Sequence, residues 1–325
     1  MIARVLALAA LLCASCACRQ NPSSDASGAA SNADVSARTL PYDRALARMA
    51  AADSFNGSVL VALPDTVFEQ TYRAASAPDG MHAASNYRYP IGEVAQLLLR
   101  AAYFRMADQG RLNLNTAIGK HLPELPQSDV INYRMLLDHR AGLPAALPDA
   151  SSQTALADLS LRSTPGTVEH FSPLGYDVLA AALARMTGTS PVEVIRTQVL
   201  EPAEMTHTGV LDFDDPPGVL AAGYSDISGQ LAPVSTGDFD EPFELRDGRG
   251  KLQGLPEYYS TIADLFYLAQ YMPESGFLKG ELSQPGVRPG YRSYFYSSLE
   301  EGKTVVVLSN HEAVALPAVV GVARG

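Results

Sequence analysis

A serine with a lysine one helical turn later could place an amine beside a hydroxyl and so activate a nucleophile. The chain has four lysines, namely Lys120, Lys251, Lys279 and Lys303. The residues three positions before them are Ala117, Gly248, Gly276 and Glu300. The sequence therefore contains no S-x-x-K pair, and this route to a serine nucleophile is closed to it.

Histidine and cysteine patterns give no other chemistry. The six histidines lie at positions 82, 121, 139, 170, 207 and 311, with neither H-x-x-x-H nor H-E-x-x-H spacing, so we predict no metal site. All three cysteines, Cys13, Cys16 and Cys18, lie near the N-terminus. The rest of the chain can form no disulfide, and we predict no cofactor.

Composition excludes other classes of protein. The 325 residues are 47% hydrophobic and 18% charged, which is typical of a folded chain. A formal net charge of -11 argues against nucleic acid as a partner, because such proteins neutralise phosphates with basic residues.

The N-terminus predicts export. Residues 1–18 carry one arginine, an apolar run from Val5 to Leu12 and then small residues, as in a signal peptide. The cysteines resemble the lipobox of bacterial lipoproteins, so we expect a lipid anchor on Cys16 or Cys18 and a membrane as partner. Ordinary cleavage near Ala17, giving a periplasmic or secreted protein, is the alternative. Residues 19–40, rich in Ser and Ala, predict a disordered tether before one domain over 41–325.

The domain has strand patterns near its two ends and helical patterns between them. Apolar spacing predicts helices over 42–52, 93–109, 132–139, 173–186, 191–200, 261–272 and 313–322. β-rich runs predict strands over 55–62, 66–72, 291–298 and 304–309. We therefore expect an α+β fold, in which both chain ends pair into one antiparallel sheet lobe, about 41–90 and 255–325, beside a helical lobe, about 91–254.

Motifs spread along the domain carry a family resemblance. They comprise 55–61, 108–114, 121–125, 135–143, 164–167, 175–176, 186–188, 201–208, 260–264 and 304–310. In order and spacing the chain resembles the serine β-lactamase-like and penicillin-binding-protein-like family, in its class C and esterase-type branch. The resemblance implies that family's fold, with a ligand cleft between the lobes.

The resemblance also implies three catalytic motifs, and this chain departs from each. The S-x-x-K positions carry Glu93 and Gln96, and the Y-x-N positions carry Phe171 and Pro173. In the family, the K-T-G or H-x-G strand edge binds the substrate carboxylate and helps frame the oxyanion hole. Here it falls on 284–286 and keeps only Gly286, with Gln284 at its first position. His207-Thr-Gly209 spells H-x-G at an unrelated place, which we interpret as coincidence.

Some replacements could still act. Glu93 could be a base, a nucleophile or a cation ligand, but an acidic residue in a first helical turn is also favoured by the helix dipole, and we prefer that interpretation. Ser172, Ser260 and Ser283 lie near motif positions, yet isolated serines are usually caps or surface hydroxyls. His139 is expected to have a structural role.

These patterns favour a catalytically degenerate, exported envelope protein. Our first hypothesis is a binding or scaffolding protein, whose ligand could be peptidoglycan-like or another small molecule. A hydrolase with relocated machinery, using Glu93 or a nearby serine, is the second. The third is a structural protein without a ligand.

Overall fold

The computed structural model describes residues 41–74, 84, 86–146, 154–212, 220–227, 230–234, 245–247, 250–272 and 280–324. Its contacts divide the chain into two compact units, Met1–Arg44 and Ala45–Gly325. The predicted signal peptide, Cys16, Cys18 and the predicted tether all lie outside the described residues. The fold described below is that of the second unit, together with the helix that leads into it.

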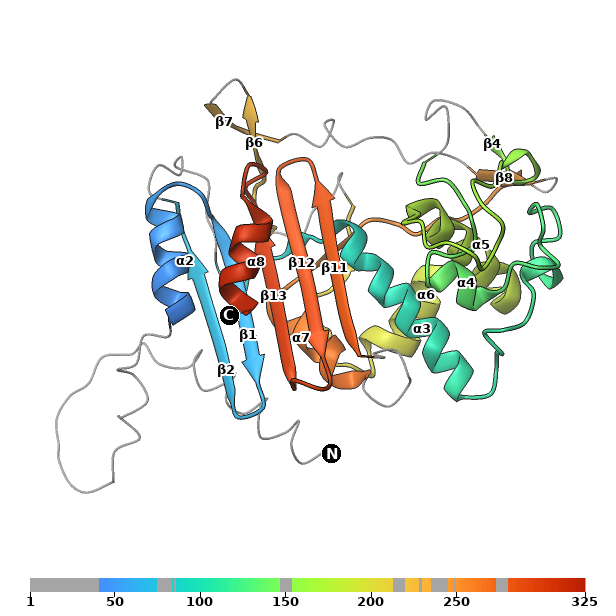
Figure 1. Ribbon diagram of the computed structural model, residues 1–325, viewed down its shortest axis with the longest axis horizontal. Helices are drawn as coiled ribbons and strands as arrows, with labels where there is room; N and C mark the ends of the chain where they lie inside the picture. Colours follow the sequence, from blue (N-terminus) through green and yellow to red (C-terminus); the bar gives the residue numbers. More distant parts are fainter. Residues whose placement is uncertain are drawn as a thin grey trace. The chain divides into compact units, whose positions relative to one another are not determined.

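A five-stranded antiparallel sheet is built from the two ends of this unit (Figure 1). Its strands are β1 (Gly57–Leu63), β2 (Thr66–Tyr72), β11 (Glu281–Arg288), β12 (Tyr291–Ser298) and β13 (Lys303–Ser309), in the order β11-β12-β13-β1-β2. β1 pairs with β13 in the register Val59 with Val307 and Val61 with Val305. The predicted antiparallel sheet formed by both chain ends is confirmed.

Helices cover the sheet on both faces because β1 and β13 bury apolar side chains on each face. Val59 and Val307 pair on one face and Leu60 and Val306 on the other, and all four are completely buried. α7 (Ile262–Tyr271) packs against β13 and β1, whereas α8 (Leu316–Arg324) packs against β12, β13 and β1. Figure 1 draws α8 in front of the sheet and α7 behind it. α2 (Pro41–Ala51) precedes β1, as predicted.

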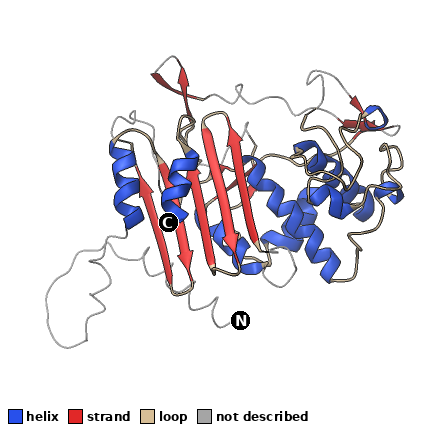
Figure 2. Cartoon of the chain, in the orientation of Figure 1, coloured by secondary structure: helices blue, strands red, loops and turns tan. Residues whose placement is uncertain are grey.

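The middle of the chain forms helices (Figure 2). They are η1 (Gly92–Ala95), α3 (Gln96–Asp108), η2 (Ile118–Lys120), α4 (Tyr133–Leu137), η3 (Leu156–Asp158), α5 (Pro173–Thr187), α6 (Pro191–Ile195) and the π-helical turn η4 (Arg196–Leu200). Ser172 and Ser190 cap α5 and α6 by accepting from the amides of Gly175 and Glu193, and a proline follows each cap. α3 begins with a 3₁₀ turn, so the predicted helix over 93–109 consists of two elements.

Short strands complete the described structure. One small sheet orders β3 (Tyr89–Pro90), β10 (Tyr258–Ser260) and β5 (Gly209–Val210), and a second orders β4 (Thr154–Ala155), β8 (Leu245–Asp247) and β9 (Gly250–Lys251). β6 (Tyr224–Ile227) pairs with β7 (Gln230–Pro233). Because β3 pairs with β10, the chain entering η1 is fixed beside the segment that leads into α7.

Taken singly, none of the helices in the described ranges combines the length and the hydropathy needed to cross a bilayer. One pair does so only when joined, namely α5 with the continuous stretch Pro191–Leu200, and that pair is bent by 84°.

Candidate active site

Two glycines bring the turn η1 against the edge strand β11. Gly92 has a φ of +51°, and a Cβ added to it would lie 2.9 Å from Val287 N. A Cβ added to Gly286 would lie 2.3 Å from both Ile91 O and Ser293 Oγ. Glycine favours this left-handed turn and leaves the space that this close backbone approach needs. Both positions therefore fix the distance between η1 and β11.

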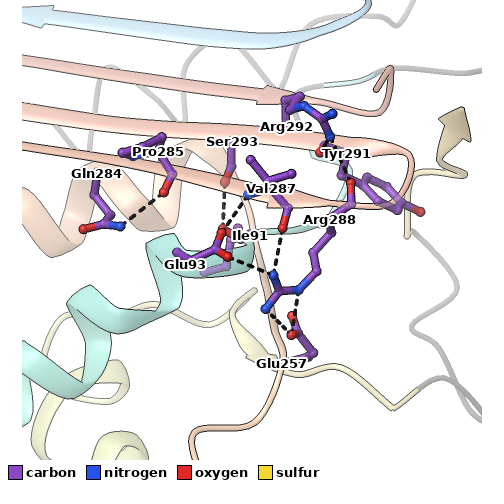
Figure 3. A network of polar contacts seen from close by, with 10 residues as sticks. All are labelled: Ile91, Glu93, Glu257, Gln284, Pro285, Val287, Arg288, Tyr291, Arg292 and Ser293. Atoms are coloured by element: carbon purple, nitrogen blue, oxygen red, sulfur yellow. Dashed lines mark hydrogen bonds and ion pairs between the residues drawn. The ribbon is translucent and has the colours of Figure 1, made fainter. Parts of the chain in front are cut away.

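Ser293 closes the contact from the neighbouring strand. It faces Gly286 in the register of β11 and β12. Its hydroxyl donates to Ile91 O at 2.7 Å, and the residue is 1% exposed. Because Gly286 has no side chain, this hydroxyl reaches past β11 to the turn (Figure 3). Gly286 thus leaves the space in which Ser293 bonds to Ile91 O.

Glu93 points its carboxylate at β11 (Figure 3). Oε2 accepts a hydrogen bond from Val287 N at 2.8 Å, and Oε1 lies 3.2 Å from Arg288 Nη1. The turn that carries Glu93 has no side-chain cap. Glu93 lies in the first turn of η1, where an acidic residue was expected. The strand in addition supplies a directed amide and a full positive charge, which together bind a carboxylate strongly.

Arg288 is held from its other side. Its Nε donates to Glu257 Oε1 at 2.7 Å, Nη2 also forms an ion pair with Glu257, and Nη1 donates to Val287 O at 2.7 Å. The paired carboxylates of Glu257 and Glu93 keep the pKa of Arg288 raised against the opposing effect of its burial. One guanidinium thus joins η1, β11 and the segment before β10.

The charges of Glu257 and Arg288 also act on Asp177 of α5. Its Oδ1 accepts from Leu255 N at 2.9 Å, and a Cβ on Gly254 would lie 2.7 Å from that oxygen. Burial raises the pKa of Asp177 to about 7, and the Glu257 carboxylate adds to this rise, whereas the Leu255 amide and Arg288 oppose it. Protonation of Asp177 near neutral pH would relieve part of the negative charge around Glu257.

The outer edge of β11 offers little to an extended peptide. In an antiparallel strand the N–H and C=O of alternate residues face the same side, so Pro285 shares the outer side with Val287. Pro285 has no N–H, and its carbonyl accepts from Gln284 Nε2 at 3.2 Å. Val287 N is taken by Glu93 and Val287 O by Arg288. The edge groups of these two residues are therefore already used within the chain.

Gln96 stands one turn after Glu93, at the start of α3. In a 3₁₀ turn the side chains at i and i+3 eclipse one another, so Gln96 lies on the same face as Glu93. Gln96 is 3% exposed, and its Oε1 is buried without a hydrogen-bond partner among the described residues. A carboxamide cannot accept a proton as an amine does. Glu93 therefore pairs with the Arg288 guanidinium. The residue at position 96 offers it no amine that could take up a proton.

Phe171 and Pro173 lie at the start of α5. Phe171 is 49% exposed, and its ring centroid lies 4.8 Å from that of His139. His139 adopts a φ of 54°, and its Nδ1 accepts from Ser172 N at 3.2 Å. Burial, aided by Arg100, lowers the pKa of His139 to about 4, so the ring is a neutral acceptor at neutral pH. His139 positions the segment that leads into α5.

The three serines near motif positions donate or share their hydroxyls within the chain. Ser172 Oγ donates to Pro144 O at 2.6 Å and accepts from Gly175 N. Ser260 Oγ lies 2.7 Å from Thr208 Oγ1 and is completely buried. Ser283 Oγ lies 2.9 Å from Tyr294 Oη. No carboxylate, imidazole or amine that could activate a serine is among these partners, and Ser283 meets only a tyrosine hydroxyl.

A second polar junction lies at Asp264 of α7. Its Oδ2 accepts from His207 N and from Thr208 Oγ1, both at 2.8 Å, and the residue is 1% exposed. Burial raises the pKa of Asp264, while Thr208 and the His207 amide oppose that rise. His207, from the H-x-G sequence at 207–209, thus contributes its amide to this junction.

Among the described residues, no group of three or more His, Cys, Asp or Glu residues could hold a metal ion.

The sheet flanked by helices and the turn docked on its edge strand define a class of protein. A model of the beta-lactamase family matches residues 47–281, which is more than half of the chain. The chain belongs to the beta-lactamase family. The predicted α+β fold of the β-lactamase and transpeptidase type is confirmed, and so is the family resemblance.

Relatives by sequence include "Protein flp" of Staphylococcus aureus (strain NCTC 8325 / PS 47), which is 26% identical over 200 residues covering 56% of this chain and 40% of the relative. The chain thus spans well under half of that relative's length. The "Putative penicillin-binding protein PbpX" of Bacillus subtilis (strain 168) is 23% identical over 248 residues, covering 67% of this chain and 60% of the relative.

Solved structures share the fold. FmtA from Staphylococcus aureus superimposes with a TM-score of 0.68 at 18% identity and 87% coverage of each chain. A class C beta-lactamase gives 0.68 at 15% identity, covering 90% of this chain and 96% of the other.

Proposed function

We propose that this chain is a non-enzymatic member of the beta-lactamase family that binds a ligand or scaffolds other components in the bacterial envelope. The observation that carries the proposal is the Glu93 carboxylate on Val287 N at 2.8 Å. In the family, position 93 holds the nucleophile and the strand edge after Gly286 frames the oxyanion hole. Here one side chain removes the nucleophile and also fills the hydrogen-bonding position of that amide.

Electrostatics supports the same proposal. An oxyanion hole stabilises negative charge that develops on the substrate during the reaction. The carboxylate of Glu93 already holds a full negative charge next to Val287 N and Arg288. A second anion would have to displace it, because two like charges in contact repel one another.

The N-terminal sequence supports a location in the envelope. We propose that residues 1–18 direct export and that Cys16 or Cys18 carries a lipid, with residues 19–40 as tether. The lipid and the tether would hold the domain near the membrane surface. There the domain could bind a ligand of peptidoglycan type or another small molecule.

Covalent labelling tests the absence of catalysis. The purified domain is incubated with a fluorescent penicillin and, separately, with a fluorophosphonate, and its intact mass is measured beside an active penicillin-binding protein as positive control. We expect no mass increase in this chain. A stoichiometric adduct on any serine would overturn the proposal and favour a hydrolase with relocated machinery.

A further inference from the structure

We propose that Asp177 and the segment 252–257 form a proton-controlled clamp: the protonated carboxyl group holds this segment on α5, and opening of the segment releases the proton to solvent. The segment, here called the strap, joins β9 to β10 and has no regular secondary structure. The clamp attaches the strap to α5 tightly in acid and more loosely at neutral pH. It would operate whether or not the domain binds a ligand.

The strap has contacts with both α5 and β11. Asp177 Oδ1 accepts from Leu255 N at 2.9 Å, which joins the middle of the strap to α5. Gly254 allows this approach, since a Cβ there would lie 2.7 Å from the same oxygen. At the end of the strap, Glu257 Oε1 accepts from Arg288 Nε of β11 at 2.7 Å. The strap therefore runs from a carboxyl group of α5 to a guanidinium of β11.

Carboxyl groups outnumber cations around Arg288. The guanidinium forms ion pairs with Glu257 and Glu93 (Figure 3), and its charge also acts on Asp177. Three ionised carboxylates and one guanidinium give this cluster a net charge of −2, and one proton on Asp177 halves that charge. Like charges held close together away from water favour protonation of one of the groups.

Asp177 is the member of the cluster that takes this proton. Glu257 and Glu93 contact the guanidinium directly, whereas Asp177 contacts an uncharged amide. Burial, together with the Glu257 carboxylate, raises the pKa of Asp177 to about 7. The protonated group keeps an oxygen that accepts from Leu255 N and gains an O–H donor. Nearby, Glu257 Oε2 is a buried acceptor without a donor among the described residues.

The pH range of the clamp follows from the difference between the closed and the open strap. When the strap opens, water reaches Asp177, and its pKa returns to about 4. Between about pH 4 and pH 7, opening therefore releases one proton, and the open fraction rises about tenfold per pH unit. Below this range the carboxyl group is protonated in both forms, and above it the group is ionised in both, so the open fraction levels off.

Opening of the strap also acts on the turn η1 through Arg288. Glu257 accepts from Nε and forms an ion pair with Nη2 of this guanidinium. Once Glu257 has left with the strap, Glu93 is the carboxylate that stays on Arg288 among the described residues. The clamp thus links the protonation of a residue on α5 to the charge balance at η1.

The test follows hydrogen exchange of the Leu255 amide by NMR in the full chain between pH 5 and pH 8. Protection is calculated against the exchange rate of an unstructured peptide at each pH, with the amides of β13 as internal reference. We expect the protection of Leu255 to fall at least about tenfold between pH 5 and pH 7 and then to level off. A local measurement is needed because burial lowers the pKa of His121, His139 and His311, which changes the global stability with pH in the opposite sense.

Asp177→Asn removes the titrating group and keeps its shape. The carboxamide still offers an oxygen to Leu255 N but stays uncharged at every pH, so we expect Leu255 to remain protected from pH 5 to pH 8. Asp158→Asn, which changes an exposed aspartate of η3, should keep the pH profile of the wild type. In the wild type, the ¹³C shift of the Asp177 carboxyl group should titrate with a midpoint near pH 7.

Three results would refute the clamp: protection of Leu255 that does not change with pH in the wild type, the same pH profile in Asp177→Asn, or a carboxyl midpoint below about pH 5. The first and the third need only the wild-type chain, so the test remains decisive if Asp177→Asn does not fold.

Discussion

Two polar junctions of this domain differ in burial and in charge. At Asp264, which is 1% exposed, the segments 201–208 and 260–264 meet through hydrogen bonds to one carboxylate oxygen. At Glu93, where the family resemblance would place the reactive residues, a partly exposed set of ion pairs joins η1 to β11 and Glu257. The first junction joins its elements through neutral donors around one buried carboxylate, whereas the second joins them through opposite charges.

Glycines set the geometry of the second junction. Gly92 and Gly286 allow η1 to approach β11 within the distance that a Cβ would block. The comparison teaches that the donors at Val287 and Arg288 lie where the backbones of η1 and β11 approach, and that the chain's own carboxylate uses them here.

The largest expected effect comes from breaking the approach of η1 to β11. Gly286→Ala would place a Cβ 2.3 Å from Ile91 O and Ser293 Oγ. Because strand and turn must separate, we expect a loss of about 2–3 kcal/mol in the free energy of unfolding, measured by urea denaturation.

Gly321→Ala is the matched control for Gly286→Ala. It adds the same methyl group in α8, where nothing lies within 4 Å of the new Cβ. We expect it to be neutral or stabilising by about 0.5–1 kcal/mol, since glycine is unfavourable inside a helix. An equally small effect of Gly286→Ala would show that the close approach is not needed.

A smaller effect is expected at the Asp264 junction. Thr208→Val removes a hydrogen bond to Asp264 Oδ2 and another with Ser260 Oγ. Asp264 keeps only the His207 amide on that oxygen, so we expect a loss of about 1–2 kcal/mol by the same denaturation. Thr189→Val, at an exposed position, should change stability by less than about 0.5 kcal/mol. If the two variants behave alike, the Asp264 junction contributes nothing specific.

The sequence predicted most of the fold because the elements carry local signals. β2 and β12 were predicted with the observed bounds, and α5 begins at Pro173 after its Ser172 cap, as its sequence indicates. The π-helical turn over Arg196–Leu200 was not predicted, since its apolar spacing resembles that of an ordinary helix. The 3₁₀ start of α3 was missed for the same reason.

The candidate site was predicted only in part. Family motifs placed Glu93, Gln96 and Gly286 at the site, because each lies in register with a motif. Nothing local pointed to Val287 and Arg288 as partners of Glu93, because the contact joins residues about 200 positions apart through the docking of η1 on β11. The opposite charges of Glu93 and Arg288 were the one available signal, and they become informative only once η1 is known to lie on β11.

The most direct test of this account is the hydrogen exchange of the Val287 amide, which lies at the outer edge of β11 and is bonded to Glu93. Exchange is measured by NMR in the wild type and in Glu93→Ala, with the amides of β13 as internal reference. We expect slow exchange in the wild type and exchange at least about tenfold faster in the variant, since an unbonded edge amide opens without global unfolding. Equal exchange rates in the two proteins would contradict the claim that Glu93 occupies this amide.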